Sequence, residues 1–218
     1  MHFQFFVDFD GTIARDDVGH TFFTTFGANE SAYLEIEKAW LNDALSSADL
    51  YRAACPHIQV TPAQFEAFLE KQHIDPSFLT FFKYARSHNE SMLVLSDGFH
   101  NYIEPILRAA GLSELEICAN AFDFVDDGTI APSFPYEAFT CGKCANCKRY
   151  HVQSRREAGL TSVFIGDGKS DCCGAVECDV IFAKKDLEKF CVDEKLDYFP
   201  FRDFHDVIRN LEIIRNRA

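Results

Sequence analysis

The chain has 218 residues, 47% hydrophobic and 25% charged, so it can bury a full core and carry one domain with a modest insertion. Its 21 basic and 34 acidic residues leave a net charge of −13, which disfavours nucleic acid as a partner. No apolar run reaches the roughly 18 residues of a membrane helix, and the first residues lack a signal-peptide pattern. We therefore expect a cytoplasmic protein without a membrane partner, whose nine cysteines are mostly reduced.

A largely apolar run from Phe3 to Val7 predicts the first strand, at 3–8, and this run leads directly into Asp8 and Asp10. Alternate side chains of a strand share a face, so the two carboxylates could point the same way where the strand ends. Two carboxylates held so close repel each other unless a cation lies between them or one carries a proton. The pair therefore suits a hard divalent metal such as Mg²⁺, and a strand running into an acidic turn is the alternative.

Helical periodicity follows this strand and continues to about residue 88. Thr61 and Pro62 form a good helix start, because Thr caps the helix and Pro suits its first position. The roughly 60 residues of helix before the next strand far exceed what a simple crossover needs. We therefore expect a helical cap at 14–75 inserted into a core made of 1–13 and 76–218. The helices are predicted at 17–26, 31–45, 47–55, 62–73 and 76–87.

Strands alternate with helices in the rest of the chain, which predicts a three-layer α/β fold around a mostly parallel, Rossmann-like sheet. A hairpin signal lies at Asp126-Asp127-Gly128. Ligands of such sheets bind beyond the carboxyl ends of the strands, and Ser96 and Asp167 fall there together with the end of the first strand. Further strands are predicted at 91–96, 122–125, 161–165, 180–182 and 198–201, and further helices at 100–110, 148–158 and 203–214.

Four short motifs follow one another in a fixed order along the chain, three of them at the ends of apolar strands. They are Asp8-Phe9-Asp10-Gly11-Thr12, Leu93-Val94-Leu95-Ser96-Asp97-Gly98, Lys148, and Gly166-Asp167-Gly168-Lys169-Ser170-Asp171. In this order the motifs resemble those of the haloacid dehalogenase superfamily of phosphohydrolases. The resemblance spans nearly the whole chain and implies a Mg²⁺-dependent phosphatase that works through an aspartyl-phosphate.

The resemblance also implies a role for each motif residue. Asp8 would be the nucleophile, and Asp10 would protonate the leaving group and then activate water. Mg²⁺ would be held by Asp8, by the backbone carbonyl of Asp10 and by Asp167, with Asp171 as an outer or water-mediated ligand. The residues expected to bind the phosphate or the rest of the substrate are Phe9, Thr12, Asp17, Ser96, Asp97, Gly98 and Lys148.

Several of these residues have a plainer alternative. Asp167 and Asp171 could merely cap the following helix, and Ser96 could be an ordinary cap at the end of its strand. Asp17 could be an acid favoured by the positive end of a helix dipole. Asp97 adds a carboxylate that we expect near the mouth of the site.

Among the lysines near these motifs, we favour Lys148 as the motif residue because it begins a helix ahead of the strand at 161–165. Lys143 is its rival. Lys169 lies within the last motif and is expected to be a solvated turn residue.

A large helical insertion after the first motif is typical of subfamily IB, the group that includes phosphoserine phosphatase. The segment Cys141–Lys148 resembles the Cys-rich segment of the methionine-salvage 2-hydroxy-3-keto-5-methylthiopentenyl-1-phosphate phosphatase and of the phosphoethanolamine/phosphocholine phosphatases. Ser96-Asp97-Gly98 departs from the Ser-Gly-Gly of phosphoserine phosphatase. The resemblance therefore implies a small phosphomonoester as substrate, most like the methionine-salvage ester, with phosphoserine, phosphoethanolamine and phosphocholine as alternatives.

Two further questions stay open at the level of sequence. A phospho-ligand-binding regulatory protein on the same fold is the non-enzyme alternative, and the chain is expected to be a monomer or a homodimer. Cys141, Cys144 and Cys147 could bind a structural Zn²⁺ together with His151, or form a disulfide, or only pack. Cys173, which follows the last motif, is expected to pack within its helix.

Overall fold

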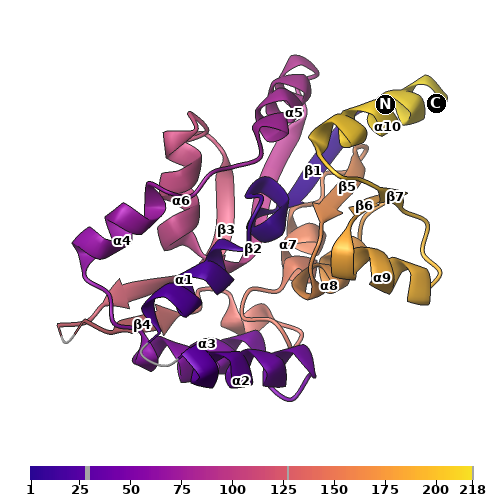
Figure 1. Cartoon of the computed structure of the whole chain (residues 1–218). Helices are drawn as coiled ribbons and strands as arrows, with labels where there is room; N and C mark the ends of the chain where they lie inside the picture. Colours follow the sequence, from indigo (N-terminus) through magenta and orange to yellow (C-terminus); the bar gives the residue numbers. More distant parts are fainter. Residues whose placement is uncertain (28–29, 127, 218) are drawn as a thin grey trace.

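Residues 1–27, 30–126 and 128–217, which this computed structural model describes, form a seven-stranded sheet of order β4-β3-β2-β1-β5-β6-β7 (Figure 1). Neighbouring strands run parallel except β3 and β4, which are antiparallel. The chain builds the sheet outward from β1 in both directions, so the strand order reverses at β1 and opens a crevice there for a ligand. The strands are β1 (Phe3–Asp8), β2 (Ser91–Phe99), β3 (Glu116–Phe124), β4 (Ile130–Ser133), β5 (Thr161–Gly166), β6 (Val180–Ala183) and β7 (Phe199–Pro200).

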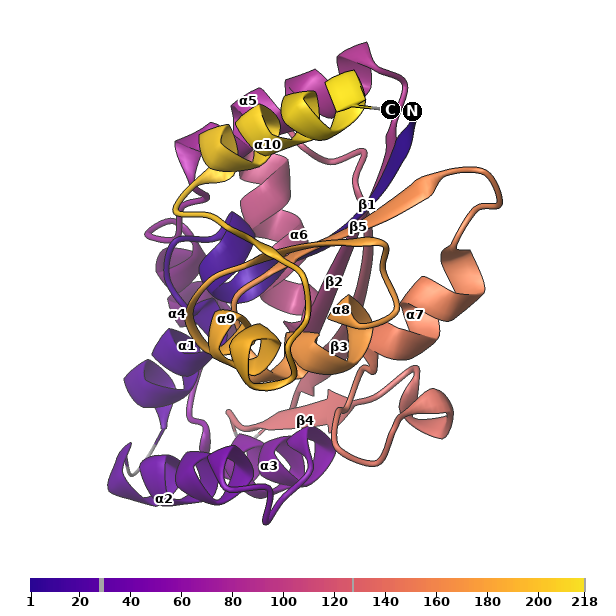
Figure 2. The same ribbon diagram turned by 90° about the vertical axis from the view of Figure 1, so that its right-hand side faces the viewer.

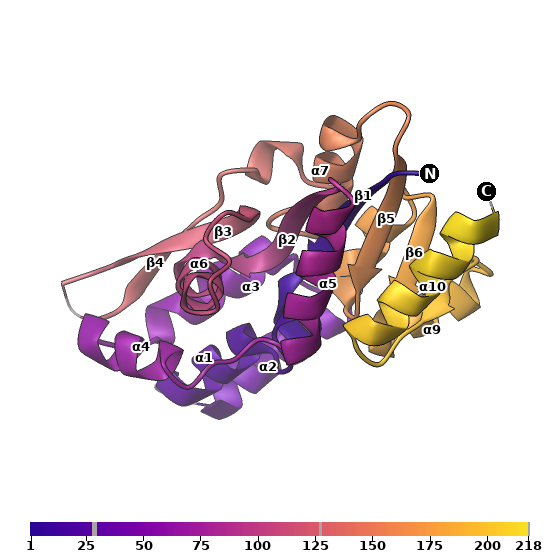
Figure 3. The same ribbon diagram turned by 90° about the horizontal axis from the view of Figure 1, so that it is seen from above.

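Helices cover both faces of the sheet, which confirms the predicted three-layer α/β fold. Successive side chains of a strand point to opposite faces. Phe5 of β1 therefore belongs to the buried cluster that includes residues of α5, α6 and α10, while Phe6 belongs to the cluster with residues of α7, α8 and α9. Figure 2 shows α5 and α10 side by side, and Figure 3 shows α5 and α7 on opposite sides of the sheet. The helices are α1 (Val18–Phe26), α2 (Glu30–Leu41), α3 (Ser47–Ala54), α4 (Pro62–Leu69), α5 (Pro76–Ser87), α6 (His100–Ala109), α7 (Lys148–Arg155), α8 (Cys172–Ala175), α9 (Lys185–Asp193) and α10 (Phe204–Arg217).

The helices α1–α4 form a cap inserted between β1 and α5, as predicted. Figures 1 and 2 show α2 and α3 beyond one end of the sheet, next to β4. The chain leaves the core and returns to it at one place, where Ala14 pairs with Ile74 and the N–H of Asp75 donates to the carbonyl of Ile13 at 2.7 Å. Because the two crossing segments are hydrogen-bonded here, we keep 14–75 as the proposed extent of the cap.

Aromatic rings fill the cap and attach it to the hairpin of β3 and β4. The ring of Phe22 lies at the centre of this cluster and is fully buried. Its centroid lies 5.5–5.8 Å from five other rings, four from the cap and one from β3. Aromatic pairs at such separations add to the free energy of simple area burial. The five partner rings are Phe23, Phe26, Phe65, Phe68 and Phe122.

The structure differs from the sequence prediction in several elements, among them β3, α9 and β2. β3 begins at Glu116, well before the predicted 122, because its first half mixes polar and apolar residues and hides the pattern of a strand. α9 was missed because only Leu187 and Cys191 of its nine residues are buried. β2 runs on to Phe99 instead of ending at 96. Asp127, in the predicted hairpin turn, lies outside the described residues.

Within the ranges that the structure describes, no helix is both long enough and apolar enough to pass through a membrane.

Phe22→Ala should lower the free energy of unfolding by about 3–5 kcal/mol, because it empties the centre of the ring cluster. Equilibrium urea unfolding measures this change. Leu34→Ala is the matched control, because Leu34 of α2 is 42% exposed and its truncation should change stability by less than about 0.5 kcal/mol. A loss of similar size in both variants would contradict the assignment of Phe22 to the cap core.

Candidate active site

A cavity of about 340 Å³ lies between the cap and the carboxyl ends of the central strands. Asp8, Ser96 and Asp167 reach it from β1, β2 and the end of β5. Helices α1, α2 and α3 supply its opposite wall, with residues such as Tyr33 and Tyr51. The motif residues predicted from separate parts of the sequence therefore meet at one site, at the position expected for a parallel sheet.

Asp8 faces a buried lysine at the bottom of this cavity. The Lys148 ammonium group contacts Oδ1 of Asp8 and Oδ1 of Asp171, and the Lys148 side chain has no exposed surface. Burial alone would lower the pKa of Lys148, but the two carboxylates raise it, so the ammonium group stays charged. The other oxygen of Asp171 accepts hydrogen bonds from the N–H groups of Asp167 (2.9 Å) and Gly168 (2.8 Å). Asp171 therefore fixes Lys148 to the turn that carries Asp167.

Asp167 lies next to Asp8 and reaches a second lysine. Its Oδ2 is 2.7 Å from the Lys185 ammonium group, and its Oδ1 accepts a hydrogen bond from the Thr12 hydroxyl at 3.4 Å. Thr12 is buried and holds Asp167, whereas the sequence prediction placed it on the substrate. Gly11 makes the approach possible, because its φ is +72° and a Cβ there would lie 2.3 Å from Oδ2 of Asp167.

Asp8, Asp167 and Asp171 offer carboxylate oxygens that lie within 4.8 Å of one another, a set that suits a hard divalent cation. Burial raises the pKa of Asp8 most, the Asp171 carboxylate raises it further, and Lys148 opposes both effects. A bound cation would favour the ionised form of the same group. Asp171 uses Oδ1 on the fully buried Lys148 and Oδ2 on two backbone N–H groups, whereas Oδ2 of Asp167 pairs with the largely exposed Lys185, so Asp8 and Asp167 are the better candidates for direct ligands.

Asp10 connects the core to the first helix of the cap. Its Oδ1 accepts from the backbone N–H groups of Val18 (3.0 Å) and Gly19 (3.2 Å), at the start of α1. Its Oδ2 accepts from the hydroxyl of Tyr102 at 2.9 Å and from that of Ser96 at 3.3 Å. Burial raises the pKa of Asp10 to about 7, so the group can both give and take a proton near neutral pH.

Gly98 makes room for the contact between Asp10 and Tyr102. A Cβ at Gly98 would lie 1.8 Å from the Tyr102 oxygen and 2.9 Å from Oδ2 of Asp10. The N–H of Gly98 donates to the Ser96 hydroxyl at 2.9 Å. The Ser96 hydroxyl is therefore already hydrogen-bonded to both Gly98 and Asp10. Phe9, also predicted at the phosphate site, is fully buried and directs its ring toward Tyr102.

Asp97 is buried and holds a loop, whereas the sequence prediction placed its carboxylate near the mouth. Its Oδ1 accepts from the N–H groups of Ala145 (3.0 Å) and Asn146 (2.7 Å). Burial raises the pKa of Asp97 to about 6, and the nearby Ser47 of the cap together with the N–H groups of Asn146 and Ala145 opposes this rise. Asp97 borders the cavity, but its carboxylate mainly positions the loop that leads to Lys148.

The cap wall of the cavity carries acidic groups. Asp17 is exposed and caps α1 by accepting from the N–H of His20 at 2.7 Å, so the alternative role as a helix cap is realised. Glu37 of α2 binds Nδ1 of His20 at 2.7 Å and the Tyr33 hydroxyl at 3.0 Å. Among the described residues that line the cavity, the cap contributes no lysine or arginine.

Lys169 ties the cap to the core and is not the solvated turn residue that we expected. Its ammonium group donates to the carbonyls of Trp40 (2.7 Å) and Leu41 (2.9 Å) and pairs with Asp43 at 3.1 Å. These groups form the last turn of α2 and the residues after it, where free carbonyls attract a cation. Because Asp43 comes from the cap, this contact could not be found in the motif itself.

The cysteine segment differs from its prediction in one member. Cys141, Cys144 and Cys147 do come together, but the fourth residue of the group is Cys173 of α8 and not His151. His151 instead makes a hydrogen bond to Asn146, with Nε2 2.6 Å from Oδ1. Cys173 therefore contacts Cys144 and Cys147 of the loop before α7 and does not only pack within its own helix.

Three further residues that shape the site have no signal in the sequence. Tyr102 binds Asp10 across 92 residues of chain, Asn146 binds the carbonyl of Ser96 across 50, and Lys185 binds Asp167 across 18. The fold brings each pair together, and no regular spacing in the sequence identifies the partners. Of the two lysines weighed from the sequence, Lys148 contacts Asp8, whereas Lys143 pairs with Asp43 of the cap.

Comparison with known proteins agrees with this geometry. The family model described as haloacid dehalogenase-like hydrolase matches residues 5–175. The chain is 26% identical over 217 residues to the 2-hydroxy-3-keto-5-methylthiopentenyl-1-phosphate phosphatase of Bacillus cereus (strain G9842), covering 97% of each. It is 27% identical over 214 residues to Pdp3-interacting factor 1 of Schizosaccharomyces pombe (strain 972 / ATCC 24843), covering 95% of this chain and 93% of that protein.

Solved structures show the same fold. A phospho-aspartyl intermediate analogue of phosphoserine phosphatase superposes with a TM-score of 0.71 at 17% identity, covering 96% of this chain and 99% of that one. A phosphoserine phosphohydrolase-like protein from Francisella tularensis subsp. tularensis SCHU S4 gives a TM-score of 0.72 at 14% identity, covering 96% and 99%. At these identities the likeness concerns the arrangement of the chain and not its substrate.

Asp10→Asn should stabilise the metal-free protein at pH 8 and have little stabilising effect near pH 4. The folded state keeps the Asp10 proton up to about pH 7, whereas the unfolded chain releases it near 3.8, so ionisation destabilises the fold as pH rises between these values. The gain at pH 8 should be about 1–4 kcal/mol, since one pKa unit corresponds to about 1.4 kcal/mol. Urea unfolding in EDTA at both pH values measures it.

Asp16→Asn is the matched control for this prediction, because Asp16 is exposed and its neutralisation should change stability by less than about 0.5 kcal/mol. Equal destabilisation by Asp10→Asn at pH 4 and pH 8 would show that Asp10 does not titrate as described.

Lys169→Met should loosen the end of α2 without unfolding the core. Hydrogen bonds from an ammonium group are worth about 1.5–3 kcal/mol, so amides near Trp40 should exchange with deuterium roughly 10-fold faster. Hydrogen–deuterium exchange with mass spectrometry measures the change. Lys143→Met is the control, since Lys143 makes one exposed pair with Asp43 at 3.4 Å. Unchanged exchange in Lys169→Met would mean that Lys169 does not hold the cap.

Proposed function

This chain belongs to the haloacid dehalogenase-like hydrolase family, and on that premise we propose that it is a Mg²⁺-dependent phosphatase of a small phosphomonoester. The observation that carries the proposal is the meeting of Asp8, Asp10 and Asp167 beside the buried Lys148, at the strand ends that face the cavity. A protein that only bound a phosphate would not need an acid whose pKa lies near 7 next to the nucleophile.

In this proposal Asp8 attacks phosphorus and forms an aspartyl-phosphate. A carboxylate nucleophile divides a difficult hydrolysis into two easier steps. Lys148 contacts Oδ1 of Asp8, which leaves the other oxygen for the attack and keeps the carboxyl group in one orientation. The same ammonium group provides positive charge for the phosphate oxygens, as do the backbone N–H groups around Phe9.

Asp10 acts as the acid and then as the base. With a pKa of about 7 it holds a proton for the leaving oxygen in the first step and takes one from the attacking water in the second. Tyr102, Val18 and Gly19 fix its two oxygens by hydrogen bonds, so the carboxyl group keeps its direction during both transfers.

The donor set fits Mg²⁺, with Asp8, Asp167 and the backbone carbonyl of Asp10 as the residues that would hold it. Asp171 supports this set from outside through Lys148 and the backbone of Asp167. The ion supplies positive charge that neutralises the phosphoryl group during its transfer. Thr12 and Lys185 orient Asp167 toward its neighbours.

The first substrate candidate is 2-hydroxy-3-keto-5-methylthiopentenyl-1-phosphate. The Bacillus phosphatase named for this compound aligns with 97% of the chain, so core and cap are both shared. The second candidate is an amine-bearing ester such as phosphoserine, phosphoethanolamine or phosphocholine. The acidic cap wall with Asp17 and Glu37 favours it, since these carboxylates could bind an ammonium group. We place this activity in the cytoplasm, where the nine free cysteines would stay reduced.

The experiment is a phosphate-release screen with Mg²⁺ over both classes of ester. Asp8→Asn should reduce kcat by at least about 1000-fold on every substrate, because loss of the nucleophile removes the covalent route. EDTA should abolish turnover and Mg²⁺ should restore it. Asp16→Asn is the control, since this neighbouring carboxylate is exposed and does not line the cavity.

Two outcomes would contradict the proposal. Turnover retained in Asp8→Asn would reject Asp8 as the nucleophile, and no phosphate release from any ester would reject the phosphatase. A preference of at least about 10-fold in kcat/KM, or about 1.4 kcal/mol, decides between the two substrate classes.

A further inference from the structure

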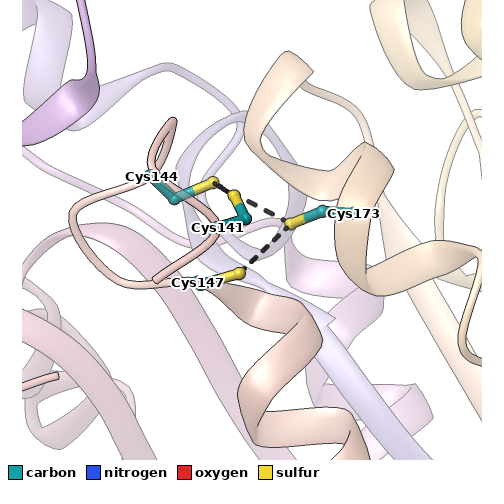
Figure 4. A group of neighbouring side chains, drawn as sticks. All are labelled: Cys141, Cys144, Cys147 and Cys173. Atoms are coloured by element: carbon teal, nitrogen blue, oxygen red, sulfur yellow. Dashed lines mark hydrogen bonds between the residues drawn. The ribbon is translucent and has the colours of Figure 1, made fainter. Parts of the chain in front are cut away.

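A second cluster of chemically active side chains lies outside the proposed catalytic site. Figure 4 shows the sulfur atoms of Cys141, Cys144, Cys147 and Cys173 turned toward one another. Three of these residues come from the loop before α7, and Cys173 comes from α8. Their Sγ atoms all lie within 4.8 Å of one another, and Cys144 and Cys147 are buried.

We propose that these four cysteines bind one structural Zn²⁺ as a closed tetrathiolate site. The sulfur separations are 3.7 Å for Cys141–Cys144 and 3.8 Å for both Cys144–Cys173 and Cys147–Cys173. A Zn–S bond is about 2.3 Å, so two sulfurs of a tetrahedral site lie about 3.8 Å apart. The observed separations therefore match the edges of such a site.

The same distances argue against the other uses of these thiols. Sulfurs of a disulfide lie about 2.05 Å apart, so none of these three contacts is a disulfide. Thiolates are soft ligands that select zinc over magnesium. Four protein sulfurs leave no open position for water or substrate, so the site would be structural.

The surroundings provide both access and compensating charge. Cys141, Cys144 and Cys173 border a second cavity of about 480 Å³, which gives an ion a route from solvent. Lys143 and Arg149 border the same cavity and would offset the negative charge that four thiolates leave around a dication. Gly142, between the first two cysteines, has a φ of +81° and lets the loop turn back sharply.

A zinc ion at this place would join two segments that position the proposed catalytic residues. Cys147 directly precedes Lys148, and Cys173 lies two residues after Asp171, the partner of Lys148. α8 has only four residues, too few for a helix to be stable by itself. The metal would therefore fix α8 against the start of α7 independently of the reaction in the cavity.

The test measures metal content and sulfur ligation. Protein expressed with added zinc and purified under reducing conditions should carry about one zinc per chain by elemental analysis. Replacing the zinc with Co²⁺ should give the intense thiolate-to-cobalt absorption that carboxylate ligands do not produce. Cys173→Ser should lose this absorption and bind zinc at least about 100-fold more weakly, since a tetrathiolate site needs all four ligands.

Cys172→Ser is the matched control, because Cys172 neighbours Cys173 on the same helix but its Sγ faces the carbonyl of Gly168 at 3.9 Å. It should keep the zinc and the cobalt spectrum. If Cys173→Ser does not fold, Co²⁺ titration of metal-depleted wild-type protein decides. No thiolate absorption in that titration, full zinc retention in Cys173→Ser, or fewer than nine reactive thiols in denatured, unreduced and chelator-treated protein would overturn the proposal.

Discussion

The buried ammonium group of Lys148 is the interaction on which the rest of the site depends. It lies between Asp8 and Asp171 with no exposed surface, and its positive charge lets these two buried carboxylates stay close. Removing one partner from such a group leaves an uncompensated buried charge, which costs far more than the net value of the pair. These contacts therefore hold the segments that carry Asp8, Lys148 and Asp171 in one fixed arrangement.

Several features of the fold serve this arrangement. Gly174 allows α8 to approach α7, since a Cβ there would lie 2.8 Å from Cβ of Lys148. Asp97 and Asn146 hold the loop before Lys148 against β2 and β3 through backbone contacts. The proposed zinc site includes Cys141, Cys144 and Cys147 of the same loop. Packing, hydrogen bonds and metal ligation would thus all hold the short segment around Lys148 in place.

The cap and the chemistry are linked through Asp10. One of its oxygens binds the first turn of α1 and the other binds Tyr102 of α6, so the carboxyl group spans cap and core. Lys169 fixes the far end of α2 to the motif that carries Asp167. A movement of the cap away from the core would have to break these contacts, so the position of the cap and the alignment of Asp10 depend on each other.

The sequence by itself determined the layered α/β fold, the inserted cap and the meeting of Asp8, Asp10 and Asp167. Strand and helix periods are local, and parallel strands bring their carboxyl ends to one edge whatever the side chains are. The tertiary structure alone decided that Cys173 and not His151 completes the sulfur cluster, that Lys169 holds the cap, and that Tyr102 orients Asp10. These contacts join residues far apart in the chain, and their partners are set by how helices pack on the sheet, which no spacing in the sequence records.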